Sequence, residues 1–78
     1  MKTWPIWMEG FHVMEGVCHA KYCGEWPGDT FAAACAAWAA QEDPGPCYQG
    51  MQLYDKARNT WWGCRLFDNE RDARAIFG

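Results

Sequence analysis

The sequence contains few aliphatic residues. Only six of its 78 residues are Leu, Ile or Val, and with Phe they make up 10 positions. A share this low is typical of disordered chains when the net charge is large. Here the net charge is only −3, and 17% of the residues are aromatic. Because one aromatic side chain can bury about 150–250 Å², we expect residues 1–78 to form a single ordered domain with an aromatic core.

Long apolar runs and an excess of basic residues are also lacking. The longest apolar run, residues 31–40, is mostly Ala and is far shorter than the ~20 residues of a membrane-spanning helix. No apolar stretch near the start is typical of a signal peptide, so we expect a cytoplasmic protein. Acidic residues outnumber basic ones by ten to seven, and the basic ones are scattered. This balance argues against a broad nucleic-acid-binding surface.

The first half of the chain is predicted to form two strands and a helix. Aromatic and β-branched residues favour strands over residues 4–11 and 17–26, which we expect to pair in antiparallel fashion. An Ala-rich helix is predicted over residues 31–40, where Asp29 and Thr30 are suitable N-caps. One face of that helix carries side chains that are usually buried, namely Phe31, Cys35 and Trp38.

The second half is predicted to repeat this order of elements. Strands are expected over residues 48–54 and 60–67, joined by a hairpin loop at 55–59, and Asn69 is a suitable cap for a final helix. The order β-β-α-β-β-α predicts an α+β domain, with a small antiparallel sheet of about four strands and two helices packed on one face. We expect five aromatic side chains in the core: Trp7, Phe31, Trp38, Phe67 and Phe77.

The adjacent residues Trp61 and Trp62 are the strongest candidates for a partner-binding site. On a regular strand over residues 60–67 the two indoles would face opposite sides, so one of them requires a cover or a partner. Arg65 would share a face with Trp61, and Arg beside Trp is a frequent combination in protein interfaces. Asp68 and Glu70 follow in sequence and add acidic charge to the same predicted surface. The Trp61–Arg65 pair could alternatively stack on a nucleobase.

A metal site is a second hypothesis. His12, Cys18, His19 and Cys23 are residue types that bind zinc, and the partners of Cys18 and Cys23 in such a site could be Cys47 and Cys64, or His12 and His19. On a regular strand Cys18 and Cys23 would face opposite sides, so shared ligation requires a bulge or loop. Because the five cysteines are odd in number and no secretion signal is recognised, we expect reduced thiols.

Catalytic motifs are not found. The sequence contains no Cys-x-x-Cys, no Gly-rich phosphate loop, no Gly-x-Ser-x-Gly and no His-Glu-x-x-His. Cys18 has His19 as its neighbour, but adjacent side chains of a strand point apart. We therefore expect neither an enzyme nor a cofactor.

The ending of the chain, WGCRLFDNERDARAIFG at residues 62–78, resembles the ending of a group of small, largely uncharacterised phage and prophage proteins. Residues 5–7, 9–11 and 30–31 are similar to the same group. The resemblance implies an origin in a mobile element and implies no catalytic residues. By analogy, small phage proteins of this kind often inhibit a host defence complex, as anti-CRISPR proteins do.

These observations favour an accessory protein of a phage or mobile element that binds a protein, such as a bacterial defence complex. Its acidic surface could imitate nucleic acid towards a basic channel of the partner. The alternative is a small metal- or nucleic-acid-binding module. The Ala-rich helix and the surplus of Trp also leave a homodimer open. Six acidic residues are candidates for the mimicry: Glu42, Asp43, Asp55, Asp68, Glu70 and Asp72.

Overall fold

Two long antiparallel strands begin the fold. The structure, a computed structural model, describes residues 2–42, 46 and 52–78. In it β1 (Thr3–Met8) pairs with β4 (Lys21–Pro27) from Thr3↔Pro27 to Met8↔Lys21. The register shifts between Ile6 and Trp7, because Cys23 forms a bulge with no partner on β1. The predicted antiparallel pairing of the first two strands is therefore confirmed.

Three short strands complete the sheet. They are β5 (Tyr54–Asp55), β6 (Thr60–Trp61) and β7 (Cys64–Phe67), and each pairs in antiparallel fashion with its neighbour. β7 lies beside β1 through the pairs Trp7↔Phe67 and Met8↔Leu66. The resulting order is β4-β1-β7-β6-β5, so β1 joins the two halves of the chain.

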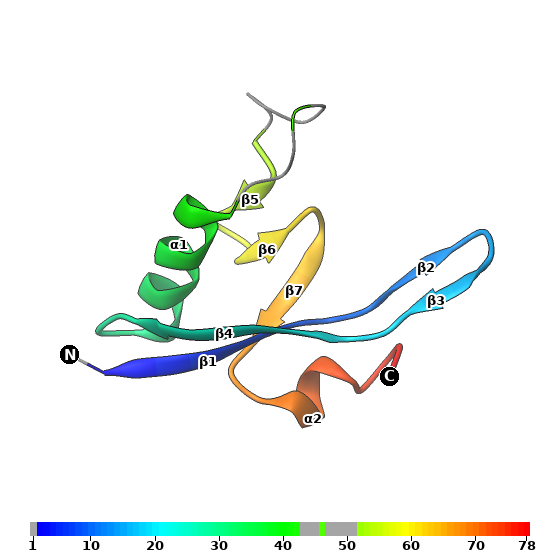
Figure 1. Cartoon of the computed structure of the whole chain (residues 1–78), viewed down its shortest axis with the longest axis horizontal. Helices are drawn as coiled ribbons and strands as arrows, with labels where there is room; N and C mark the ends of the chain where they lie inside the picture. Colours follow the sequence, from blue (N-terminus) through cyan, green and yellow to red (C-terminus); the bar gives the residue numbers. More distant parts are fainter. Residues whose placement is uncertain (1, 43–45, 47–51) are drawn as a thin grey trace.

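A hairpin extends from the ends of β1 and β4. It consists of β2 (Phe11–Val13) and β3 (Gly16–Cys18), which pair only with each other in the described structure. We call residues 11–18 the arm, and Figure 1 shows it standing away from the sheet and helices. Each of the two predicted strands 4–11 and 17–26 is thus interrupted, at residues 9–10 and 19–20.

The helix α1 (Phe31–Gln41) covers one face of the sheet. Thr30 caps its N-terminus, as predicted, with its hydroxyl oxygen accepting a hydrogen bond from Ala33 N at 3.2 Å. Its buried side chains pack on Ile6 and Leu66, which together make one core cluster. That cluster consists of Ile6, Ala34, Cys35, Trp38 and Leu66. None of the helices in the described ranges has the length and apolar character needed to cross a membrane.

The helix α2 (Glu70–Ala73) packs near the other face of β1 and β7. Asn69 caps it, as predicted, by accepting a hydrogen bond from Asp72 N at 2.8 Å. The guanidinium of Arg74 lies 5.5 Å from the ring of Trp7, whereas the neighbouring side chain of Ile6 lies beneath α1. Consecutive side chains of a strand point to opposite faces, and Figure 1 shows α1 and α2 on opposite sides of β1 and β4.

The α+β class, the antiparallel sheet and the packing of both helices against it are confirmed. The sheet has five strands instead of about four, and the helices lie across from each other instead of sharing one face. Of the five aromatic residues expected in the core, Trp38 is buried in it and the half-buried Phe31 packs against it, whereas Trp7, Phe67 and Phe77 are half-buried outside this cluster. Trp7 instead packs against Tyr22, with ring centroids 5.0 Å apart, on the side that faces Arg74.

The third and fourth strands also differ from the prediction. Much of the strand expected at 48–54 lies outside the described residues, and β5 begins only at Tyr54. The predicted hairpin loop is present as a four-residue turn, 56–59. The prediction of a single strand over residues 60–67 was wrong. The structure has two strands there, β6 and β7, separated by a turn at residues 62–63.

The core cluster predicts the effect of truncating Ile6. The Ile6 side chain is fully buried, whereas Ile76 is 64% exposed. We expect Ile6→Ala to lower the free energy of unfolding by about 2–4 kcal/mol, through lost burial and a residual cavity. The matched variant Ile76→Ala should change it by less than about 0.5 kcal/mol. Urea denaturation followed by circular dichroism measures both, and equal effects would contradict this description of the core.

Candidate functional site: an apolar groove between the arm and the β6–β7 hairpin

A two-residue turn places Trp62 at the tip of the β6–β7 hairpin. Trp61 pairs with Cys64, and the residues between them have positive φ angles, +53° at Trp62 and +80° at Gly63. Two positive φ values define a type I′ turn, the connection whose twist matches antiparallel strands. The second position suits Gly63, but the first usually holds Asn or Asp. Trp62 is held there in the left-handed region, and its amide donates to Leu53 O at 2.9 Å.

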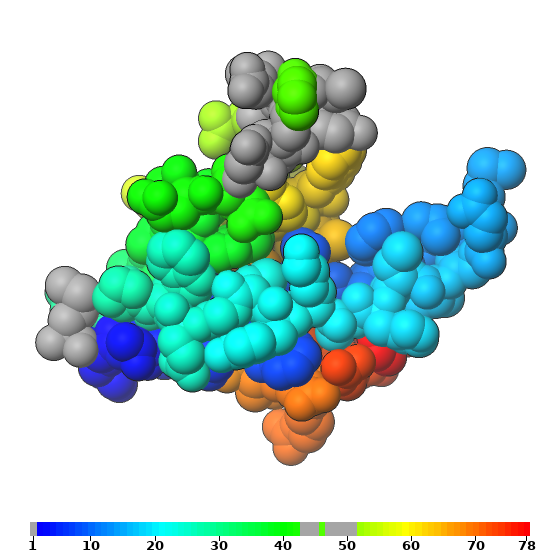
Figure 2. Space-filling model, viewed as in Figure 1, coloured from blue at the N-terminus to red at the C-terminus, as the bar shows by residue number. Residues whose placement is uncertain are grey.

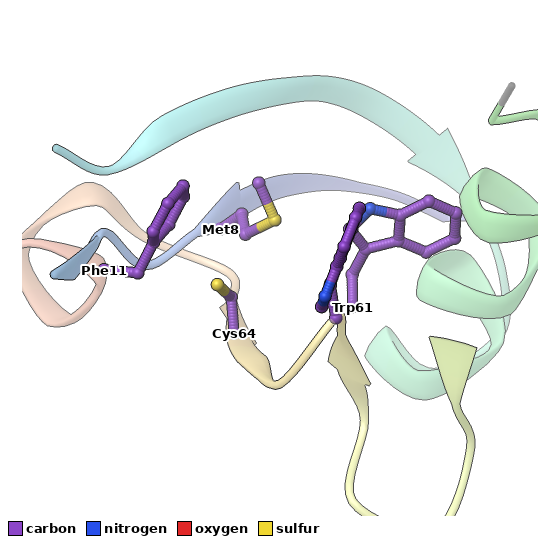
Figure 3. Close-up of a pocket in the computed structure, with 5 residues that line it drawn as sticks. Met8, Phe11, Trp61 and Cys64 are labelled. Carbon is purple, nitrogen blue, oxygen red and sulfur yellow. The ribbon is translucent and has the colours of Figure 1, made fainter. Parts of the chain in front are cut away.

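An apolar groove of about 560 Å³ lies between this hairpin and the arm. Figure 2 shows the hollow between the projecting arm and the surface formed by β6 and β7. In Figure 3, Met8 and Cys64 lie between Phe11 at one end and Trp61 at the other. The lining comes from separate parts of the sheet and consists of Met8, Phe11, Trp61, Trp62 and Cys64.

The groove exists because the pairing of β1 with β7 stops at Glu9. The Glu9 amide still donates to Arg65 O at 3.0 Å, which continues the register of Met8↔Leu66. The Arg65 amide, however, donates to the Glu9 carboxylate, Oε2, at 2.7 Å. A side chain thus takes the donor that a further ladder bond would use. Beyond this point β2 and β7 diverge, and their apolar side chains line the space between them.

Arg65 is bound within the molecule by the same carboxylate. Its Nε and Nη2 atoms donate to Oε2 and Oε1 of Glu9, each at 3.1 Å, in a two-bond pairing. These hydrogen bonds and the charge of Glu9 raise the pKa of the Arg65 guanidinium. The guanidinium also lies 5.3 Å from the ring of Phe67. The predicted pairing of Arg65 with Trp61 on one face of a strand was wrong, because the turn at 62–63 separates their strands.

Trp61 lines the groove, and its ring packs against the core on the side away from the groove. Its ring meets the ring of Trp38 edge-on, with centroids 5.2 Å apart, and Tyr54 lies opposite it on β5. The Tyr54 hydroxyl donates to Asn59 Oδ1 at 2.7 Å, and Asn59 Nδ2 lies 3.5 Å from the sulfur of Cys35 in α1. These contacts tie the β5–β6 hairpin to the helix, so Trp61 is positioned by the core.

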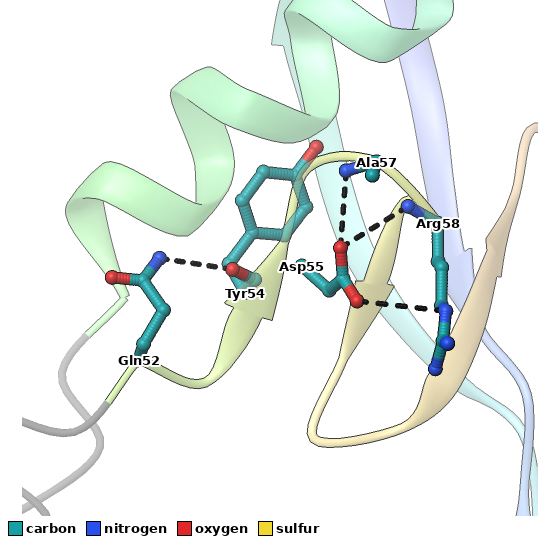
Figure 4. A network of polar contacts seen from close by, with 5 residues as sticks. All are labelled: Gln52, Tyr54, Asp55, Ala57 and Arg58. Atoms are coloured by element: carbon teal, nitrogen blue, oxygen red, sulfur yellow. Dashed lines mark hydrogen bonds and ion pairs between the residues drawn. The ribbon is translucent and has the colours of Figure 1, made fainter.

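The turn between β5 and β6 is closed by Asp55. One carboxylate oxygen accepts hydrogen bonds from the amides of Ala57 and Arg58, at 3.0 and 3.2 Å, and the other lies 3.8 Å from Arg58 Nε (Figure 4). Asn59, with φ of +55°, completes the turn in the left-handed region that Asn tolerates. The carboxylate of Asp55 is therefore engaged in holding its own turn.

The other two predicted partner-binding residues lie apart from the groove. Asp68 and Glu70 precede and begin α2, and neither lines the groove. Glu70 accepts a hydrogen bond from Arg74 Nε at 2.7 Å, and Asp68 accepts one from Asn69 Nδ2 at 2.8 Å. Of the five residues predicted, the structure brings together only Trp61 and Trp62.

The four predicted metal-binding residues are not brought together. His12 lies opposite Val17 in the arm and Cys18 lies opposite Phe11, so the two point to different faces. The Nδ1 atom of His19 is 3.0 Å from Phe77 O, and Cys23 contacts the core of the main sheet. Within residues 2–42, 46 and 52–78, no group of three or more His, Cys, Asp or Glu side chains is arranged to hold a metal ion.

The thiols of the described core have raised pKa values. Burial raises the pKa of Cys64, and the charge of Glu9 raises it further. Burial is also the main cause of the raised pKa of Cys23 and of Cys35. A thiol nucleophile needs the opposite shift, because the thiolate is the reactive form. Cys64 therefore contributes to the groove as a small apolar group with a polarizable sulfur.

Sequence reasoning missed Met8, Phe11 and Cys64 as lining residues. The available signals were Gly63 within an otherwise regular strand pattern and Gly10 between two apolar stretches, since glycine inside a strand pattern often marks a break. Glu9 was visible as an acidic residue in an apolar segment. Its partner Arg65 lies 56 positions away, and such a distant pairing leaves no periodic signal.

Comparisons with known proteins give no relationship. No family model matches the chain, and neither the curated proteins nor the solved structures include a significant match. The groove therefore has to be interpreted from its own geometry.

The raised pKa of Cys64 predicts how the alkylation rate of this thiol depends on pH. Because the folded protein favours the neutral thiol, the rise of its alkylation rate with pH should occur at higher pH than in the urea-unfolded chain. Pulsed labelling with iodoacetamide, followed by peptide mass spectrometry, measures this site by site. Reaction of Cys64 at the same pH in both states would show that the groove does not bury the thiol.

The separation of the predicted ligands also predicts the metal content. We expect purified protein to carry less than a tenth of an equivalent of zinc. Elemental analysis after gel filtration measures this, and a chelator-treated sample is the control. Stoichiometric zinc that survives gel filtration would contradict the described arrangement of His12, Cys18, His19 and Cys23.

Proposed function

We propose that the chain acts by binding a protein partner, and that the groove between the arm and the β6–β7 hairpin receives an apolar side chain of that partner. The observation that carries this proposal is the position of Trp62. Tryptophan has the largest side chain of all residues, yet Trp62 occupies a left-handed turn position and remains 55% exposed. Bulky residues in this conformation are genuine outliers, and such strain concentrates at functional sites.

The cost of placing Trp62 there is appreciable. A non-glycine residue in the left-handed region is destabilised by about 1–2 kcal/mol, while Asn or Asp would occupy the same turn position readily. The conformation of the turn therefore does not itself favour a Trp at its tip. Display of an indole to a partner gives a reason for a Trp there, since Trp is enriched among the residues that dominate binding energy in protein interfaces.

The extent of the apolar surface favours a protein over a small molecule. Phe11, which lines the groove, is itself exposed, and Met14 at the tip of the arm is exposed as well, whereas the exposed Val17 lies on the opposite face of the arm. Exposed apolar side chains therefore lie on the arm beyond the groove. Broad exposed apolar patches are typical of interaction sites between proteins, whereas a small ligand would need only the groove.

We further propose that the chain is an accessory protein of a phage or other mobile element that inhibits a bacterial defence complex in the host cytoplasm. The resemblance of residues 62–78 to phage proteins supports the origin. The exposed acidic residues Asp68, Glu70 and Asp72 at α2 support the electrostatic part of the proposal, because they could face a basic surface of the partner. Arg65, bound by Glu9, is not proposed as an anchor.

Replacement of Trp62 should separate stability from binding. In Trp62→Asn, relief of the left-handed strain offsets the lost contacts of a half-exposed ring, so we expect the free energy of unfolding to change by less than about 1 kcal/mol. In Trp61→Asn the packing on Trp38 is lost, and we expect a decrease of about 2–4 kcal/mol. Urea denaturation measures both. An equally large loss in Trp62→Asn would show that Trp62 has a structural role.

The binding proposal is tested by capture from a bacterial host lysate with three tagged proteins. These are the wild type, Trp62→Asn and the control Ile76→Asn, which alters an exposed apolar residue outside the groove. We expect proteins captured by the wild type and the control to be absent with Trp62→Asn. Loss with both variants, or with neither, contradicts the proposed site. Self-association detected by light scattering, or a salt-dependent gel shift, would instead favour a homodimer or a nucleic-acid-binding module.

The proposed biological role has a separate test. A host that carries a defence system is transformed with the wild-type gene or with Trp62→Asn and then infected with a phage that the system restricts. We expect the wild type to restore plaque formation and the variant to fail. Equal plaque counts with the wild type and an empty vector, across a panel of defence systems, would contradict inhibition of defence.

A further inference from the structure

The arm requires an anchor outside itself. Each of its strands has three residues and pairs only with the other in the described structure, and an isolated two-stranded hairpin is marginally stable in water. Yet Phe11 at the base of the arm forms one end of the groove. The position of the arm relative to the sheet therefore determines the shape of the groove.

Phe77 and Gly78 contact the links that join the arm to the sheet. The amide of Ala20 donates to Gly78 O at 2.7 Å, and His19 Nδ1 donates to Phe77 O at 3.0 Å. Gly78 has a φ of +80°, and its own amide donates to Arg74 O at 3.1 Å. This conformation turns the Gly78 carbonyl back towards Ala20, so the segment after α2 is bonded to the link between β3 and β4.

The second link, between β1 and β2, is packed into the same place. Gly10 is buried, and a Cβ added there would overlap the carbonyl oxygen of Cys18 and lie 3.0 Å from the Cβ of Phe77. Three segments therefore meet with no room for a further methyl group. The arm, the sheet and the chain after α2 are in contact at this joint, which consists of residues 9–10, 19–20 and 77–78.

We propose that Phe77 and Gly78 act as a clamp that positions the arm and thereby sets the width of the groove. The opposite wall is held independently of the joint, because Trp61 packs on Trp38 of α1. Release of the clamp would move Phe11 relative to Trp61 while leaving the core in place. The inference rests on the proposed function only in taking the groove as the binding site, and it makes Phe77 and Gly78 positioning residues.

The clamp is tested without a partner, in the full chain labelled with 5-fluorotryptophan. The double variant His19→Ala, Gly78→Pro removes the imidazole donor and replaces Gly78 with a residue that cannot adopt a positive φ. Ile76→Ala, one residue before the clamp and exposed, is the matched control. Hydrogen exchange of the Ala20 amide reports the joint, and the fluorine resonances of Trp61 and Trp62, assigned by substitution, report the groove.

We expect the double variant to accelerate exchange at Ala20 by roughly tenfold or more and to shift the resonances of Trp61 and Trp62. The resonances of Trp4 and Trp26, at the distant end of the β1–β4 pair, should not move, and Ile76→Ala should resemble the wild type. Two results would overturn the proposal. Unchanged exchange at Ala20 would show that the clamp does not hold the joint, and faster exchange with unmoved Trp61 and Trp62 would show that the joint does not set the groove.

Gly10→Ala provides a second route to the same state. The added methyl group overlaps Cys18 and crowds Phe77, so this variant should displace the joint and reproduce both changes while all hydrogen-bonding side chains remain. If every tryptophan resonance shifts in one of the two variants, that variant is unfolded. The other variant then decides whether the joint sets the groove. Since neither readout involves a partner, failure of the clamp and failure of the binding proposal, which Trp62→Asn tests, are distinguishable.

Discussion

The short seam between β1 and β7 is the contact on which the rest of the structure depends. It joins residues 3–27 to residues 54–67 through two residue pairs and the hydrogen bond from Glu9 N to Arg65 O. On one side of the seam Ile6 and Leu66 are buried beneath α1. On the other side Trp7 and Phe67 face the guanidinium groups of Arg74 and Arg65. A seam this short is sufficient because both of its faces are covered.

The end of the seam determines the surface of the molecule. The Glu9 carboxylate accepts the hydrogen bond of the Arg65 amide, so the β1–β7 ladder does not continue beyond this point. Each of the two strands is then part of a separate hairpin. The groove is the space between those two hairpins. Its position next to the seam means that the same ion pair stabilises the fold and creates the concave surface, so the site is a consequence of how the sheet ends.

The surplus of aromatic residues is divided between these roles. Trp38 and Trp61 meet edge-on at the base of the groove, Trp4 packs near Phe31, and Trp7 packs on Tyr22. These pairs replace the aliphatic contacts that the composition lacks, as expected from the large area that each ring buries. Trp62 remains half exposed on a strained turn. Its exposure and its left-handed backbone are the two observations that carry the functional proposal.

Local chemistry determined much of the fold. Thr30 and Asn69 cap the two helices as their sequence positions predicted, and the α1 face with Cys35 and Trp38 is buried at helical spacing. These features depend on residues within one or two turns of each other. The α+β class follows from the same patterns.

The sequence singled out Trp61 and Trp62, but only the tertiary structure decided which side chains surround them. Period-two alternation across residues 60–67 predicted one strand, since Trp62 and Gly63 do not form one of the common turn pairs and the turn is closed by strands β6 and β7 pairing with each other. Glu9 meets Arg65 from 56 positions away, and Phe77 and Gly78 meet the base of the arm from 58 positions away. Such contacts form only when the sheet assembles, because their partners share no local pattern. The sequence thus determined which elements form, and the assembled sheet determined which side chains face one another.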